Sequence, residues 1–238
     1  MQFENVVFYG RLGEQALRMF NLAEELPRWR GLSVLDCPGG PGSLSALLRA
    51  EGCEVTAVDP LYGLEPAELE RRALVDLDHA MAVLAGSHDI RPDFSLEDCR
   101  QEHLEALREF LADRCAHPDR YVTASLPDLP FADGSFDLVL CGHLLFSYAP
   151  LADGGLMDGP GLDLGWHRRA LAELCRVSRR EVRLYPAHTI ALEAQRHPYA
   201  EALLAERPAG WQGRFVPSRY DQGHRGCNEA LHLERRAS

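Results

Sequence analysis

Short apolar runs alternate with helical patterns along most of the chain. An apolar run at 32–35 leads into Asp36, and a second run at 55–58 leads into Asp59. Between the two runs lie a glycine-rich turn and a stretch at 44–48 whose leucines recur at helical spacing. The pattern therefore predicts a strand, a tight loop, a helix and a second strand, with one carboxylate closing each strand.

The turn after the first strand contains Gly39, Gly40 and Gly42. Glycine has no Cβ, so its backbone can lie close to a bound molecule. Asp59 stands about where nucleotide-binding βαβ units place the carboxylate that binds ribose hydroxyls. A dinucleotide and an adenosyl nucleoside both fit this unit, although Ser45 stands where the dinucleotide fingerprint has its third glycine.

These residues resemble the Asp-x-Gly-x-Gly-x-Gly motif of class I S-adenosylmethionine (SAM)-dependent methyltransferases. Asp36 matches the acid of the motif, and Gly40 and Gly42 match its second and third glycines. Pro38 stands where the first glycine usually is, which is a departure from the motif. The resemblance implies a Rossmann-like fold and SAM as cofactor.

Later segments extend the resemblance. Residues 121–146 are similar to the third and fourth strands of the family, expected at about 120–124 and 136–141, with their Leu-Pro-Phe-x-Asp-x-Ser-Phe-Asp connection. Residues 171–177 are similar to the helix before the fifth strand at 181–185, and a helix over about 188–206 is expected after that strand. The tail, 213–235, is similar to a closing hairpin of strands six and seven. The expected fold class is α/β, a seven-stranded mostly parallel sheet with helices on both faces and a terminal antiparallel hairpin. We expect one domain over 1–238.

The link between strands two and three, about 60–120, is longer than the single helix that this fold needs. Leucines at helical spacing predict two helices, at about 65–86 and 95–115, separated by Gly86 and Pro92. This helical insert has two interpretations. In the first it has no part in the reaction, and it only lengthens the fold or forms a homodimer contact. In the second it is a lid over the acceptor site that selects the substrate.

The resemblance also implies which residues hold SAM. Tyr9 or Arg11 would meet its carboxylate or ribose, because Arg can bind a carboxylate with two hydrogen bonds; the alternative is a packed N-terminal helix with Arg11 in solvent. Ser125 and the Leu126 backbone would contact the adenine, or Ser125 is an ordinary turn residue. The expected cofactor-binding residues are Tyr9, Arg11, Asp36, Pro38, Gly39, Gly40, Gly42, Asp59, Pro60, Ser125, Leu126, Cys141 and Gly142.

His143 follows the fourth strand, at the sheet edge where open α/β folds bind ligands. Its imidazole suits proton transfer near neutrality, so His143 is the candidate general base, with a structural histidine as the alternative. The Gly- and Pro-rich stretch 147–162 predicts a mobile gate beside the acceptor. Tyr148 on this gate, and Tyr185 and His188 after the fifth strand, are the candidate substrate-binding residues.

Composition narrows the function classes. The net charge is −11, which disfavours a nucleic-acid partner. The chain has no lysine, which removes Schiff-base chemistry and the P-loop lysine. Seven cysteines without a Cys-x-x-Cys, and histidines without ligand spacing, predict reduced thiols, no metal site and a cytoplasmic protein. No apolar run is long enough to span a membrane.

The expected function is transfer of a methyl group from SAM to a small-molecule acceptor. Three alternatives stay open on the sequence. They are a non-catalytic SAM-binding or regulatory protein, an NAD-dependent oxidoreductase and a nucleic-acid methyltransferase. The residues do not name the acceptor or the atom that is methylated.

Overall fold

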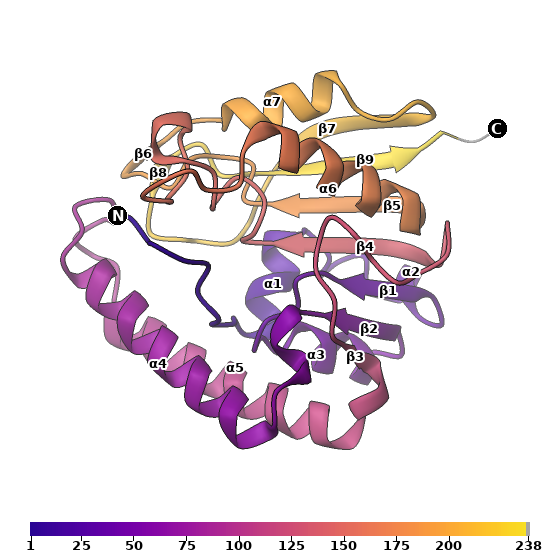
Figure 1. Cartoon of the computed structure of the whole chain (residues 1–238), viewed down its shortest axis with the longest axis horizontal. Helices are drawn as coiled ribbons and strands as arrows, with labels where there is room; N and C mark the ends of the chain where they lie inside the picture. Colours follow the sequence, from indigo (N-terminus) through magenta and orange to yellow (C-terminus); the bar gives the residue numbers. More distant parts are fainter. Residues whose placement is uncertain (237–238) are drawn as a thin grey trace.

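A seven-stranded sheet runs through the centre of the molecule (Figure 1), in the order β3-β2-β1-β4-β5-β9-β7. The first five strands in that order are parallel, and β9 is antiparallel to both β5 and β7. The computed structural model describes residues 1–236. The strands of this sheet are β1 (Ser33–Asp36), β2 (Glu54–Val58), β3 (Tyr121–Val122), β4 (Phe136–Gly142), β5 (Ser178–Tyr185), β7 (Trp211–Pro217) and β9 (Glu229–Arg235).

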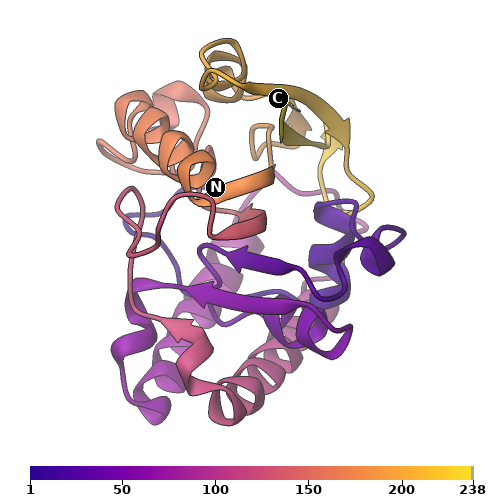
Figure 2. The same cartoon turned by 90° about the vertical axis from the view of Figure 1, so that its right-hand side faces the viewer.

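Helices cover both faces of the sheet (Figures 1 and 2). Successive side chains of a strand point to opposite faces. Leu35 accordingly packs in the cluster that includes α6 and α7, whereas Val34 packs in the cluster that includes α1, α2 and α3. The α-helices are α1 (Gly13–Met19), α2 (Leu26–Trp29), α3 (Leu44–Ala50), α4 (Pro66–Ala85), α5 (Leu96–Ala116), α6 (Leu164–Val177) and α7 (Pro198–Ala205). The expected α/β class, with its closing antiparallel pair, is confirmed.

Three expected boundaries need correction. The strand expected at 181–185 begins earlier, at Ser178, and β3 contains only two residues. The helix expected over 188–206 is wrong in its first half, because α7 starts at Pro198. His197 caps α7 by accepting a hydrogen bond from the Tyr199 N–H, and the chain before it is extended in β6 (Glu193–Ala194), which pairs with β8 (Arg225–Gly226).

The insert between β2 and β3 is a pair of helices, α4 and α5, that pack against each other. Figure 1 shows them side by side along the lower left of the molecule. The end of α5 is joined to the sheet edge, because Arg114 donates to the backbone oxygens of Tyr62 (2.8 Å) and Leu64 (3.1 Å). Across residues 1–236, every helix is too short or too polar to cross a bilayer.

Residues 1–12 form an N-terminal segment that begins beside the 147–162 loop, passes α4 and reaches the glycine-rich loop at the centre of the molecule (Figure 1). The Phe3 N–H donates to the Leu156 oxygen (2.8 Å), and the Phe8 N–H donates to Oδ2 of Asp76 on α4 (2.7 Å). The 147–162 loop, expected as a mobile gate, is folded back on itself, since the Leu156 N–H also donates to the Ser147 oxygen (2.8 Å). Both segments thus lie beside the carboxyl ends of the central strands.

Candidate functional site

The glycine-rich loop between β1 and α3 needs its glycines for different reasons. Gly40 has a φ of +52°, which favours glycine, and a Cβ there would find no atom nearer than 3.9 Å. A Cβ on Gly39 would instead lie 2.4 Å from the Tyr62 hydroxyl, which donates to the Gly40 oxygen (2.7 Å). Of these two glycines, therefore, Gly40 leaves space for a ligand and Gly39 makes room for a protein side chain.

Gly42 brings the N-terminal segment onto the loop. A Cβ on Gly42 would lie 3.2 Å from the Arg11 oxygen, and one on Gly10 would lie 2.0 Å from the Gly42 nitrogen. The contact is held by the Ser43 N–H, which donates to the Arg11 oxygen (3.0 Å), and by the Gly13 N–H, which donates to Ser43 Oγ (2.9 Å). The segment that carries Arg11 is thereby fixed directly over the glycine-rich loop.

Two buried carboxylates close β1 and β2. Asp36 accepts a hydrogen bond from Ser45 Oγ (3.1 Å), and Asp59 accepts one from the Leu61 N–H (2.9 Å). Burial, which disfavours the charged form, raises the pKa of Asp36 to about 7, and the charge of Asp59 adds to this effect. Burial likewise raises the pKa of Asp59 to about 6. Both acids therefore ionise near neutral pH, where a cationic ligand would favour the charged form.

A cavity of about 460 Å³ lies at the carboxyl ends of β1, β2 and β4. The strand order reverses between β1 and β4, which is where open α/β sheets bind ligands. One half of the cavity, the cofactor end, is lined by residues of 36–42, 58–61 and 124–126. The other half, the acceptor end, is lined by the N-terminal segment, the α4–α5 insert, the 147–162 loop and residues of 220–224.

Most of the predicted site residues line this cavity, and three do not. Cys141, Tyr185 and His188 lie outside the lining and are nearly inaccessible, with exposures of 1% each. The sequence places all three at the correct sheet edge, but their side chains point into the core. The predicted residues that line the cavity are Tyr9, Arg11, Asp36, Pro38, Gly39, Gly40, Gly42, Asp59, Pro60, Ser125, Leu126, Gly142, His143 and Tyr148.

Tyr185 and His188 still support the site from behind. The ring of Tyr185 meets the ring of His143 edge-on at 5.4 Å, and its hydroxyl lies 3.0 Å from Asn228 Oδ1. The rings of His188 and Tyr185 also meet edge-on, with their centres 5.7 Å apart. The structure thus makes these two residues a second layer that holds His143 in place.

Arg11 is enclosed by the cavity and faces aromatic rings. Its Nε donates to the Tyr220 hydroxyl (3.2 Å), and its guanidinium carbon lies 5.4 Å from the centre of the Tyr9 ring. Within residues 1–236, Arg11 has no ion pair with an Asp or Glu side chain. A guanidinium is always charged, so this group can accept an anionic partner such as a carboxylate.

His143 follows β4 with a φ of +52°, a conformation that costs a non-glycine residue about 1–2 kcal/mol. The strain is offset in part by its N–H, which donates to the Tyr185 oxygen (2.7 Å). Burial, reinforced by the Arg11 charge, lowers the pKa of His143 well below its usual value, so the ring is neutral at pH 7. Its Nε2 has no hydrogen-bond partner among residues 1–236.

Several lining residues were absent from the predicted site. The insert contributes Leu84, Ile90, Phe94, Cys99 and His103, so it forms one wall of the cavity. The Cys99 and His103 positions repeat at helical spacing along α5, but nothing in that pattern shows which face meets a ligand. The tail contributes His224, which the sequence did not single out. It also contributes Tyr220 and Gln222, for which the sequence left open a place at the pocket or an ordinary turn role.

Comparison with known proteins agrees with this geometry. Residues 98–185 match a family model described as a methyltransferase domain. The chain is 25% identical, over 99% of both chains, to an uncharacterized protein of Methanocaldococcus jannaschii. Among solved structures it resembles magnesium protoporphyrin IX methyltransferase from Synechocystis PCC 6803 with bound SAH, at a TM-score of 0.50 and 16% identity, over 94% of this chain and 83% of that one.

The family match begins inside α5 and ends with β5, so the glycine-rich loop lies outside it. The loop and its two carboxylates are therefore a separate observation that points to the same fold and ligand. The match also favours methyl transfer over the oxidoreductase and the non-catalytic alternatives. Together, the family match over 98–185 and the strand order show that the chain has the Rossmann-like fold of SAM-dependent methyltransferases and is similar to them over most of its length.

Proposed function

We propose that the protein transfers the methyl group of SAM to a small-molecule acceptor inside the cavity. The observation that supports this proposal is the continuity of the cavity. Its cofactor end has the glycine-rich loop and two carboxylates, and its acceptor end is walled by segments from four parts of the chain. Because the insert and the sheet line one cavity, we also propose that they act as one domain.

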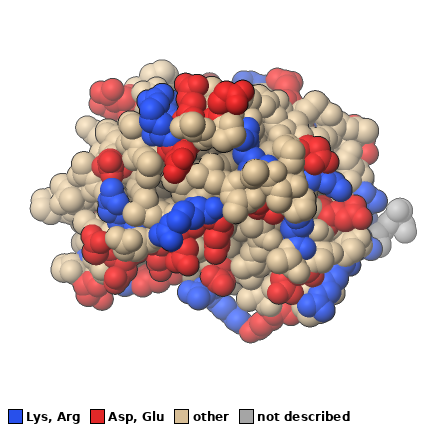
Figure 3. Space-filling model, turned by 90° about the horizontal axis from the view of Figure 1, so that it is seen from below, with Lys and Arg blue, Asp and Glu red and all other residues tan. Residues whose placement is uncertain are grey.

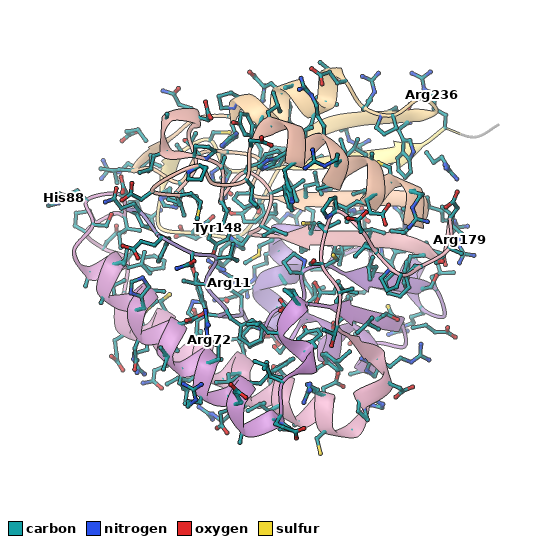
Figure 4. All side chains as sticks on the ribbon, viewed as in Figure 1. Arg11, Arg72, His88, Tyr148, Arg179 and Arg236 are labelled. Carbon is teal, nitrogen blue, oxygen red and sulfur yellow. The ribbon has the colours of Figure 1, made fainter. Side chains whose placement is uncertain are left out.

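The residues present fit SAM. The Asp59 carboxylate would accept hydrogen bonds from the ribose hydroxyls, and the space beside Gly40 lets the nucleoside lie against the loop. Ser125 and Leu126 would contact the adenine. The guanidinium of Arg11 (Figure 4), which has no carboxylate partner among residues 1–236, would bind the methionine carboxylate. The Tyr9 ring lies beside that guanidinium. SAM, when bound, supplies a methyl group already activated by a positively charged sulfur.

The protein's own part in the reaction is to hold the acceptor in line with the methyl group and to exclude water. With SAM bound, transfer would form a bond between the acceptor atom and the methyl carbon and break the carbon–sulfur bond, whose electron pair would stay on sulfur. As the new bond forms, the proton on the acceptor atom becomes strongly acidic. The neutral imidazole of His143 then accepts this proton, and its low basicity suffices because the donor is acidic.

The distribution of charged side chains on the surface favours a small-molecule acceptor and disfavours a nucleic acid. On the face shown in Figure 3, acidic and basic side chains are intermixed, and blue and red atoms alternate over the described residues. The net charge of −11 opposes a polyanionic partner. Non-specific nucleic-acid binding depends on a basic surface that neutralises phosphates.

Calorimetry with SAM and with S-adenosylhomocysteine (SAH) tests the cofactor assignment, and absence of binding by both would overturn the proposal. Incubation with methyl-labelled SAM and a metabolite extract, followed by mass spectrometry, then identifies the labelled acceptor. We expect His143→Gln to slow labelling by about tenfold or more, the lower part of the range for a general base, and to leave SAH affinity unchanged. Equal labelling by wild type and variant would assign His143 a structural role only.

A further inference from the structure

The acceptor end of the cavity is apolar, with walls that are mostly hydrocarbon. Among residues 1–236, two acidic side chains line the cavity, Asp36 and Asp59, and both lie at the cofactor end. The apolar lining of the acceptor end includes Val6, Val7, Leu84, Ile90, Phe94 and Leu156. A cationic acceptor would be buried there without a counter-charge, which is strongly unfavourable.

Positive charge at this end is already accounted for. Arg72 forms an ion pair with Asp76 on the same helix (3.0 Å). Arg11 lies over the glycine-rich loop, where the proposed partner is the carboxylate of SAM. What remains for recognition of the acceptor is a small set of neutral polar groups.

His224 is the neutral group whose hydrogen-bonding state the structure defines. Its Nδ1 lies 2.9 Å from the backbone oxygen of Asp89. A carbonyl oxygen only accepts, so Nδ1 carries the hydrogen. Burial lowers the pKa of His224 below its ordinary value, and the ring is therefore neutral at pH 7. The other nitrogen, Nε2, must then present a lone pair.

That lone pair has no partner within the described chain. His224 lines the cavity, and its Nε2 is buried without a hydrogen bond among residues 1–236. A buried acceptor atom normally has a donor, because losing its contact with water costs free energy. The missing donor is thus expected from the molecule that fills the acceptor end.

The position of His224 is fixed by contacts between the tail and the insert. The Arg91 N–H donates to the Gly223 oxygen (2.8 Å), and the Arg91 side chain pairs with Asp221 (2.7 Å). A Cβ on Gly223 would lie 2.8 Å from the Phe94 ring, so the two segments are in close contact. His224 is therefore a fixed hydrogen-bond acceptor and not a side chain free to turn away.

We propose that the acceptor is a small molecule with an apolar body and no positive charge, whose O–H or N–H group donates a hydrogen bond to Nε2 of His224. This inference rests on the proposed function, because it uses the acceptor end of the same cavity. It makes His224 a residue that determines specificity, in addition to the proposed general base His143.

The test uses three para-substituted toluenes of similar size, p-cresol, 4-methylanisole and 4-methylbenzylammonium. Each is titrated into the full protein saturated with SAH, and binding is followed by ligand-observed NMR. The first has a donor and no charge, the second lacks the donor and the third carries a positive charge. We expect p-cresol to bind at least about fivefold more tightly than the other two, the worth of one buried hydrogen bond. An Asn side chain can replace the Nδ1 contact to Asp89 but lacks Nε2, so His224→Asn should remove the advantage of p-cresol.

The matched control is His88→Asn, in the α4–α5 connection next to Asp89, where the side chain is exposed and outside the cavity lining (Figure 4). It should leave all three affinities unchanged. The inference would be overturned if 4-methylbenzylammonium or 4-methylanisole bound as tightly as p-cresol, or if none of the probes bound. It would also be overturned if His224→Asn still preferred p-cresol. Failure of SAH itself to bind would instead overturn the proposed function, so the two failures are distinguishable.

Discussion

The two ends of the cavity are built in different ways. The cofactor end comes largely from one βαβ unit, in which residues close in sequence, such as Asp36, Gly40 and Asp59, meet through two neighbouring strands. The acceptor end comes from four segments far apart in the chain, joined by contacts such as Phe3 to Leu156. The cofactor end therefore follows from local rules, whereas the acceptor end depends on how distant segments pack.

The junction between the two ends gives the largest expected effect. In Gly10→Ala the new Cβ would lie 2.0 Å from the backbone nitrogen of Gly42, and neither backbone can move without disturbing the loop. We expect the free energy of unfolding to fall by about 3 kcal/mol, the upper part of the range for overpacking. Urea unfolding of the purified protein measures this change.

Gly86→Ala is the control for this prediction, because a Cβ at Gly86 meets no atom closer than 3.7 Å. Its stability should stay within about 0.5 kcal/mol of wild type, as for other surface substitutions. Equal stabilities of Gly10→Ala and Gly86→Ala would show that the N-terminal segment does not press on the loop.

The next effect probes the cofactor end alone. Asp59→Asn keeps an oxygen that can accept from the Leu61 N–H but removes the charge. We expect SAM affinity to fall by about 2 kcal/mol, the scale of a hydrogen bond to a charged group. Calorimetry measures it, with the exposed Asp119→Asn as control. An unchanged affinity in Asp59→Asn would contradict the ribose assignment.

Arg11 lies where the two ends of the cavity meet. Two ligands, one with and one without a carboxylate, distinguish binding of that carboxylate by Arg11 from a purely structural role. Arg11→Met keeps an unbranched chain between the tyrosine rings but loses the charge. Affinity for SAH should fall by about 1.5 kcal/mol, whereas affinity for 5′-methylthioadenosine, which lacks the methionine carboxylate, should not change. Equal losses for both ligands would mean that Arg11 only supports the fold.

The smallest expected effect is a pH dependence confined to the cofactor end. Because Asp59 has a pKa of about 6, its ionised fraction falls as the pH drops from 7 to 5. If SAM needs the carboxylate, its affinity should fall by about tenfold over that interval. Asp59→Asn should flatten the profile, and an equally steep profile in that variant would assign the dependence to another group.

Without ligand, the same carboxylates act on stability in the opposite sense. Their pKa values are raised in the folded state, so the folded protein keeps these protons to a higher pH than the unfolded chain does. The stabilisation they contribute is full below about pH 4 and is lost as the pH rises towards 7. Unfolding experiments on the ligand-free protein between those limits should show this decline.

Elements that are specified by residues close together in the sequence could be predicted from it. The predicted strands around Asp36 and Asp59 and the two helices of the insert agree with the structure, because hydrophobic period and glycine positions specify them locally. The helix expected over 188–206 is wrong for 188–197, because Glu193 and Ala194 form β6 and pair with β8. Tertiary contacts overrode a weak local preference there.

The amino-acid sequence by itself determined the βαβ unit, the carboxylates that close its strands and the order of elements in the α/β fold. Only the tertiary structure decided that Arg11 is enclosed over the loop, that Tyr185 and His188 lie behind His143, and that the insert and the tail meet at His224. The physical reason is distance along the chain. A period or a glycine acts on its near neighbours, whereas the burial of a side chain depends on segments that folding alone brings together.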